Sequence, residues 1–172
     1  MARISVLLLA SFLLFGFSNQ ETKSEKTKWF KFKSEMSGSK LKFPGTFETE
    51  VTNKESGNTY KTNCIVGSVV YFMGETKHET EMTNHEEMAK VSLDAFAEKL
   101  NGTINSESDW IIKKSKGRKA KISIDESDAT VFYQVILIGQ WQYQLVIVAP
   151  NDQMPDEKSR NQFFNSFKPG KG

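Results

Sequence analysis

The sequence predicts an α+β fold, a three-layer α/β/α sandwich in which helices cover both faces of an antiparallel sheet. The elements follow one another as strands, a helix, several strands and a last helix, which is typical of an α+β domain and not of a parallel sheet built from alternating units. In addition, residues 129–150 read as two strands that are apolar on both sides. Strands of this kind are expected where both faces of a sheet are covered.

The hairpin at 129–150 is the clearest element. Gly139-Gln140 suits a two-residue turn with glycine at its first central position, which pairs Ile138 with Trp141. One face then carries Phe132, Ile136, Ile138, Trp141, Tyr143, Leu145 and Ile147. The other face carries Val131, Tyr133, Val135, Leu137, Val146 and Val148. Gln134 interrupts the first face, where an amide would mark a sheet edge, a pocket or a satisfied hydrogen bond.

The other strands are expected to form an antiparallel meander. Ordered structure begins at Trp29, and Pro44-Gly45 and residues 55–58 provide turns. Strands are predicted at residues 41–43, 46–52, 60–66 and 69–73. After the first helix, further strands are expected at 103–112 and 119–125, with a turn at Gly117.

Two helices are predicted, one for each face of the sheet. Thr83 and Glu86 form a capping box that begins the first helix, and Asn101-Gly102 ends it. Its apolar stripe consists of Ala89, Leu93, Phe96 and Leu100. The second helix begins near Pro155 and ends before Pro169. Its apolar side consists of Phe163, Phe164 and Phe167.

Length and composition predict a single domain at 29–169. The chain has 172 residues, 38% of them hydrophobic, and 23 basic against 21 acidic residues give a net charge of +2. This composition is that of an ordinary globular protein and excludes a disordered or largely membrane-embedded chain. The nearly balanced charge does not favour binding to nucleic acid.

The first eighteen residues are predicted to be a signal peptide. Arg3 supplies a positive start, residues 4–15 form an apolar run too short to span a bilayer, and small residues favour cleavage after Ser18. An uncleaved membrane anchor is the alternative. Residues 19–28 are polar and would form a flexible leader. After cleavage, no transmembrane segment is expected.

The cysteine content indicates where an exported chain would reside. Cys64 is the only cysteine, so no intramolecular disulfide can form. Small domains exported by eukaryotes usually carry several disulfides, so we expect the bacterial cell envelope, in the periplasm or outside the cell. Cys64 itself is expected to be a small buried hydrophobe, with an intermolecular disulfide or a reactive thiol as the alternative.

The chain resembles the PsbP-like family, which includes bacterial envelope proteins. The resemblance lies in Phe43-Pro44-Gly45 after an aromatic strand, in the mid-chain helix followed by a strand meander, and in a late strand at 142–150 that leads into a helix ending Phe163-Phe164-Asn165-Ser166-Phe167. It implies an antiparallel sheet between helix layers. It also implies a non-enzymatic role as a binding or accessory protein. No residues of this chain match a photosystem-specific site, so that particular function does not carry over.

Residues 74–87 contain weak candidates for a metal site. His78 and His85 stand among several glutamates, and histidine and carboxylate are good ligands for a divalent metal. The spacing matches no standard site, and the glutamates at the start of the helix are also explained by the helix dipole. We therefore predict a solvated acidic loop, no metal site and no cofactor.

Two groups of residues are candidates for binding. A basic run around Gly117 would suit anionic lipid headgroups, a glycan or an acidic protein face, although such a run is usually only solvated. It consists of Lys113, Lys114, Lys116, Arg118, Lys119 and Lys121. Trp141 and Tyr143, which alternate with Gln142 and Gln144, would suit an interaction surface or the core. In addition to these two groups, Gln134 is a single candidate residue.

We find no motif for catalysis, since no serine has a nucleophile-elbow context and neither histidine has a partner at a recognisable spacing. The sequence therefore predicts an exported, non-enzymatic binding protein that contacts a protein partner at the bacterial envelope. A carrier of a small apolar ligand or lipid, held between helix and sheet, is the alternative. An enzyme in which His78 or His85 meets carboxylates is the third hypothesis.

Overall fold

A computed structural model describes residues 28–54 and 57–170. The predicted signal peptide at 1–18 and nearly all of the leader at 19–28 lie outside these residues, as do residues 55 and 56 of the turn predicted at 55–58. Nine strands are described: β1 (Phe30–Lys33), β2 (Lys40–Phe43), β3 (Glu48–Lys54), β4 (Gly57–Val66), β5 (Val69–Lys77), β6 (Thr103–Ile112), β7 (Ser115–Ile124), β8 (Ala129–Ile138) and β9 (Trp141–Pro150).

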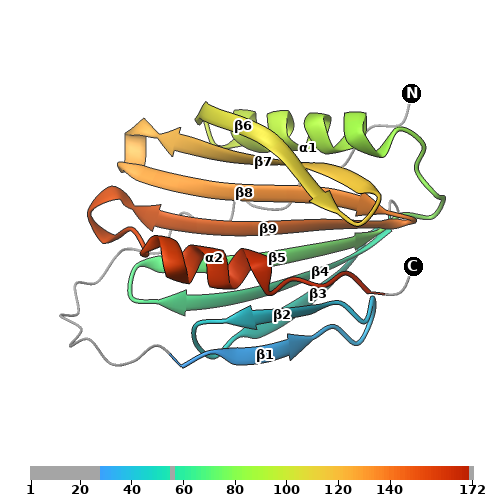
Figure 1. Cartoon of the computed structure of the whole chain (residues 1–172), viewed down its shortest axis with the longest axis horizontal. Helices are drawn as coiled ribbons and strands as arrows, with labels where there is room; N and C mark the ends of the chain where they lie inside the picture. The colour runs from blue at the N-terminus through green and yellow to red at the C-terminus, as the bar shows by residue number, and fades with distance from the viewer. Residues whose placement is uncertain (1–27, 55–56, 171–172) are drawn as a thin grey trace.

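Seven of these strands form one antiparallel sheet in the order β3-β4-β5-β9-β8-β7-β6, and β1 and β2 form a separate two-stranded sheet. The helices of the described chain are α1 (His85–Lys99) and α2 (Glu157–Asn165), with short 3₁₀ turns at Asp125–Ser127 and Asn151–Gln153. α1 lies behind the large sheet in Figure 1, whereas α2 and the β1–β2 hairpin lie in front of it. We call these two sides the α1 face and the α2 face. Neither helix has the length and apolar character needed to cross a bilayer.

The predicted three-layer sandwich is wrong, because the protein is rich in β-structure and neither face has a complete helical layer. α1 packs mainly on β7 and β8. On the opposite face, α2 has nine residues, and much of the cover there comes from the two-stranded sheet β1–β2. The two covers lie over opposite halves of the sheet and overlap at its centre. β8 and β9 are apolar on both sides because they lie in this overlap.

The β8–β9 hairpin has the predicted register. Ile138 pairs with Trp141 across Gly139-Gln140, and Gly139 has a φ of 58°, which glycine adopts without strain. The two apolar faces enter two different clusters. One, beneath α1, contains Val131, Tyr133, Val135, Leu137 and Val146; the other, beneath α2 and β1–β2, contains Ile136, Trp141, Tyr143, Leu145 and Ile147.

The predicted start of α1 is wrong, whereas its predicted end is confirmed. α1 is preceded by Asn84 in the left-handed conformation, at φ 61°, with no side-chain cap. Thr83 therefore does not cap the helix, and Glu86 bonds to Lys116 instead of closing a capping box. At the other end, Asn101 is left-handed and the amide of Gly102 donates to the carbonyl of Ala97, as in the αL and Schellman endings of helices.

The predicted turn at Gly117 is also wrong. β6 and β7 are joined at Lys113-Lys114, where Lys113 adopts a φ of 55°, and Ile112 pairs with Ser115. Gly117 lies inside β7. A Cβ atom at this position would come within 2.1 Å of the carbonyl oxygen of Val135. The glycine is therefore needed for close approach of the β8 backbone and not for a turn.

A buried carboxylate joins the β1–β2 hairpin to the large sheet. Glu75 of β5 is 1% exposed, and its Oε1 atom accepts hydrogen bonds from the hydroxyls of Ser37 and Ser39, the second at 2.6 Å. Both serines lie in the loop between β1 and β2. Burial raises the pKa of the neighbouring Tyr143 phenol; a hydrogen bond with Ser37 opposes this effect and the charge of Glu75 adds to it. Buried charge is costly unless it is hydrogen-bonded, so the loop and the carboxylate depend on each other.

We expect the replacement Ser39→Ala to lower the free energy of unfolding by about 1.5–3 kcal/mol, the range for a hydrogen bond to a charged group. Denaturant unfolding measures this. Ser123→Ala on β7 is the control, since the half-buried Ser123 hydroxyl makes no hydrogen bond to a described residue. Equal effects of the two replacements would contradict the role of the Glu75 contact.

Alkaline pH should destabilise the fold. Burial raises the pKa of the Cys64 thiol from 9.0 to about 11 and that of the Tyr71 phenol from 10.0 to about 12. Above pH 9, the unfolded chain loses these protons while the folded chain keeps them, so the free energy of unfolding falls as the pH rises, by up to about 1.4 kcal/mol per pH unit for each group. We expect Tyr71→Phe to reduce the fall between pH 10 and 12. Denaturant unfolding at several pH values tests this, and an unchanged slope in the variant would refute it.

Candidate binding surface on the α2 face

The register of the large sheet aligns side chains of the α2 face in rows. One row runs through Cys64, Tyr71, Ile147, Phe132, Lys121 and Ser106. The next row runs through Thr62, Met73, Leu145, Gln134, Lys119 and Ser108. In both rows the side chains from β4, β5 and β9 are buried and those from β8, Phe132 and Gln134, are half-buried, whereas the lysines and serines at the β6–β7 end are exposed. The α2 face is therefore open over this part of β6 and β7, whereas Trp110, further along β6, packs against Phe167 just after α2.

The open half of the α2 face carries cations without acids. Because side chains alternate along a strand, Glu107 and Asp109 of β6 point to the α1 face, whereas Lys119 and Lys121 of β7 point to the α2 face. On this face the described residues of β6, β7 and β8 include no aspartate or glutamate. The two lysines have no ion-pair partner in the described part of the chain.

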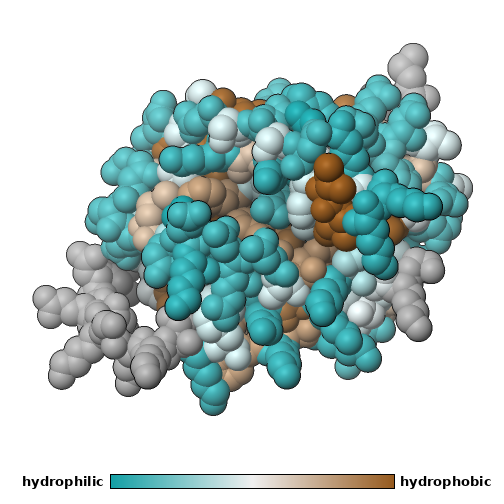
Figure 2. All heavy atoms as spheres, viewed as in Figure 1, coloured by the Kyte–Doolittle hydropathy of each residue, from teal (hydrophilic) through white to brown (hydrophobic). Residues whose placement is uncertain are grey.

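Arg160 of α2 extends this basic surface. Its guanidinium lies 4.7 Å from the centre of the Phe132 ring, and its Nη1 atom donates to the carbonyl oxygen of Pro155 at 2.7 Å. The adjacent carboxylate of Asp156 accepts from the backbone amide of Ser159, as an N-cap. Figure 2 shows a strip of apolar residues beside α2, bordered by hydrophilic residues. Lys119, Lys121, Arg160, Phe132 and Gln134 thus form one surface, which we call the basic trough.

Gln134 places an unused acceptor in the basic trough. Its Oε1 atom is buried and has no hydrogen-bond partner among the described residues. Most buried polar atoms have a partner, and each exception calls for an explanation. Gln134 lies between Leu145 of β9 and Lys119 of β7, at the border between the covered and the open part of the face. The sheet-edge interpretation of this amide is wrong, because β8 is paired on both sides, with β9 and with β7. The unpaired oxygen fits the pocket interpretation better than a satisfied hydrogen bond.

The structure separates the basic residues around Gly117 into three groups. Lys113 and Lys114 form the exposed turn between β6 and β7. Lys116 and Arg118 lie on the α1 face, where Lys116 bonds to Glu86 at 2.6 Å. Only Lys119 and Lys121 belong to the basic trough. The six residues are therefore not one basic patch, because alternation along β7 sends neighbouring cations to opposite faces.

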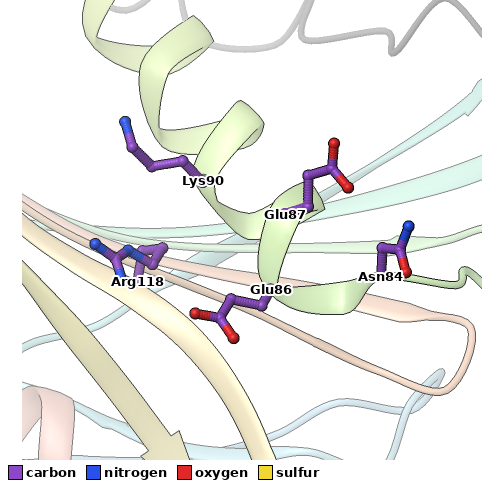
Figure 3. Close-up of a pocket in the computed structure, with 5 residues that line it drawn as sticks. All are labelled: Asn84, Glu86, Glu87, Lys90 and Arg118. Atoms are coloured by element: carbon purple, nitrogen blue, oxygen red, sulfur yellow. The ribbon is translucent and has the colours of Figure 1, made fainter.

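An open depression of about 550 Å³ lies beside the start of α1. It is lined by Asn84, Glu86, Glu87, Lys90 and Arg118 (Figure 3). Arg118 bonds to Glu107 and to Asp109, and the bond to Glu107 raises the pKa of the guanidinium. Lys90 lies between Asp94 and Glu107. Because both cations of the depression are already paired, it is a weaker candidate than the basic trough.

The other candidate residues either belong to the core or form no site. Trp141 and Tyr143 are 8% and 1% exposed and stack on each other with ring centres 6.3 Å apart, which supports the core interpretation of both. The amide of Gln142 links His78, at 3.2 Å, to the hydroxyl of Ser92 on α1. In the described part of the chain, no three histidine, cysteine or acidic residues are placed to share a metal ion. Nothing in the geometry joins His78 to His85.

Arg160 is not among the binding residues predicted from the sequence. The signal was present, because Arg160 precedes Phe163, Phe164 and Phe167 by three, four and seven residues and so shares their face of α2. A cation within an apolar helical stripe must reach solvent or find a partner in the core. Here the partner is Phe132, which lies 28 residues earlier in the chain. The contact between Arg160 and Phe132 could therefore not be predicted from the sequence.

No protein-family model and no curated protein matches this sequence. A crystal structure of a protein from Bacteroides thetaiotaomicron is similar to 77% of this chain and 45% of that chain, with a TM-score of 0.40 and 8% sequence identity. This chain thus spans less than half of the length of that neighbour. A likeness this slight bears on neither fold nor function, and membership of the PsbP-like family stays a prediction.

We expect Gln134→Leu to raise the free energy of unfolding by about 1 kcal/mol, since it removes a buried unpaired acceptor and adds apolar contact. Thermal or denaturant unfolding measures the change. Gln144→Leu on β9 is the control, because the half-buried Gln144 has no buried unpaired atom. Destabilisation by Gln134→Leu would show that the amide of Gln134 has a partner in the folded protein.

Proposed function

We propose that this protein is a non-enzymatic binding protein that contacts an acidic protein partner through the basic trough. The observation that carries the proposal is the separation of charge by face. The acids of β6 lie on the α1 face with Lys116 and Arg118, whereas Lys119 and Lys121 remain exposed and unpaired on the α2 face. Complementary charge steers association and suppresses wrong partners. The predicted export signal supports a partner at the bacterial envelope.

The geometry favours binding over the other two hypotheses. An apolar carrier needs space between helix and sheet, but side chains of two packed clusters occupy both interfaces here. The buried carboxylate of Glu75 is enclosed by Ser37 and Ser39, which are themselves buried. It has no histidine among its hydrogen-bond partners, so its contacts support a structural role.

The proposal is tested with poly-L-glutamate as an acidic polypeptide probe. We expect Lys119→Ser to weaken binding about 2- to 5-fold at low salt, because an exposed ion pair contributes up to about 1 kcal/mol. Binding should also weaken as salt is added, since exposed charges are screened. Fluorescence anisotropy of the labelled polymer gives both results for the purified protein.

Lys116→Ser is the matched control. It removes the same charge from the same strand, three residues away, but on the α1 face. We expect it to leave the affinity nearly unchanged. Equal losses from both variants would mean that only net charge matters, and no binding at low salt would refute the proposed function.

A further inference from the structure

We infer that Arg160, Lys121 and Gln134 form a subsite for an oxyanion that carries a neighbouring hydrogen-bond donor, as an acidic peptide does with its carboxylate and backbone N–H. The inference rests on the proposed function, because the subsite lies within the basic trough. It adds a chemical requirement. The surface recognises two adjacent oxygens of one oxyanion, and not negative charge alone.

Arg160 is held in place before any partner binds. The guanidinium lies over the Phe132 ring at 4.7 Å, and one N–H group is fixed by the carbonyl of Pro155 at 2.7 Å. No described carboxylate forms an ion pair with it. The carboxylate of Asp156 accepts from the amide of Ser159, and the charge of Arg160 helps to lower the pKa of Asp156 from beyond ion-pair distance. A guanidinium has five N–H donors. Several are therefore available, in an orientation that two contacts define.

Lys121 supplies a second cation beside the first. Lys121 and Phe132 are register partners on neighbouring strands, and both point to the α2 face. Partners of this kind have Cβ atoms about 5 Å apart. Because Arg160 lies on the Phe132 ring, the ammonium group of Lys121 can reach the same ligand. No acid of β6, β7 or β8 on this face competes for either cation.

Gln134 supplies the acceptor. It lies two residues after Phe132 on the same face of β8, which corresponds to about 7 Å along the strand. Its Oε1 atom is buried without a partner in the described protein, while the side chain as a whole is half-buried at the border of the open face. A rotation of the amide would therefore bring this acceptor to a donor from a ligand. A simple inorganic anion offers only the charge. A peptide with an acidic side chain offers the oxyanion and, one peptide unit away, an N–H group.

The fork of Arg160 is what distinguishes this subsite from a general basic surface. Two parallel N–H groups match the two oxygens of a carboxylate, and they match a phosphoryl group in the same way. Lysine offers a point charge without this shape. The oxyanion could therefore be the carboxylate of an acidic residue or the phosphoryl group of a phosphorylated one, and two probes separate these sources.

The test measures fluorescence anisotropy with a labelled hexaglutamate peptide and, separately, with a labelled phosphoserine peptide of equal charge. We expect Arg160→Lys, which keeps the charge, to weaken binding about 5-fold by removing the fork. We expect Gln134→Leu to weaken it about 3-fold by removing the acceptor, while the fold becomes more stable. Arg118→Lys on the α1 face is the control and should have no effect. The probe that binds more tightly, with the same sensitivity to Arg160→Lys, identifies the source of the oxyanion.

The outcomes separate this inference from the proposed function. If Lys119→Ser weakens binding while Arg160→Lys and Gln134→Leu bind both peptides like the wild type, the trough acts through charge alone and the subsite is refuted. If Lys119→Ser has no effect either, the proposed function also falls. Thermal melting of each variant shows whether a loss of binding comes from a loss of folding. Because Gln134→Leu is expected to stabilise the fold, a loss of binding in this variant could not be caused by unfolding.

Discussion

The pairing of β8 with β9 over ten residue pairs places two apolar surfaces back to back, and both must be removed from water. α1 covers one of them, and α2 together with β1–β2 covers the other. The rest of the arrangement follows from this requirement. Strands towards the two ends of the sheet need cover on one face only, because their side chains alternate between apolar and polar. Each cover therefore extends over a different half, and two areas of sheet stay open.

Alternation along β7 then decides the electrostatics. Lys116 and Arg118 share the α1 face with the acids of β6, where they form ion pairs, while Lys119 and Lys121 are left on the face without acids. A shift of one residue in the pairing of this strand would exchange the two sets of side chains. Register is therefore what creates the basic trough, and the burial of the apolar side chains of β7 beneath α1 is what maintains that register.

Two buried polar groups on the α2 face differ in whether the chain itself satisfies them. The carboxylate of Glu75 is fully enclosed, and two serine hydroxyls satisfy it within the chain. The amide oxygen of Gln134 is buried without a partner, at the border of the open surface. The first arrangement stabilises the docking of β1–β2. The second leaves an acceptor without a partner, and it is this acceptor that the proposed subsite would use.

The sequence by itself determined the local elements: the alternation of the strands, the tight turn at Gly139, the end of α1 at Gly102 and the apolar side of α2. These depend on neighbours within a few residues. Only the tertiary structure decided what covers each face, because that depends on where α1 and β1–β2 dock and not on any local pattern. It also decided the site. Gly117, which suggested a turn, is required by the approach of a strand that comes later in the chain, and Arg160 meets Phe132 only when α2 folds back over the sheet.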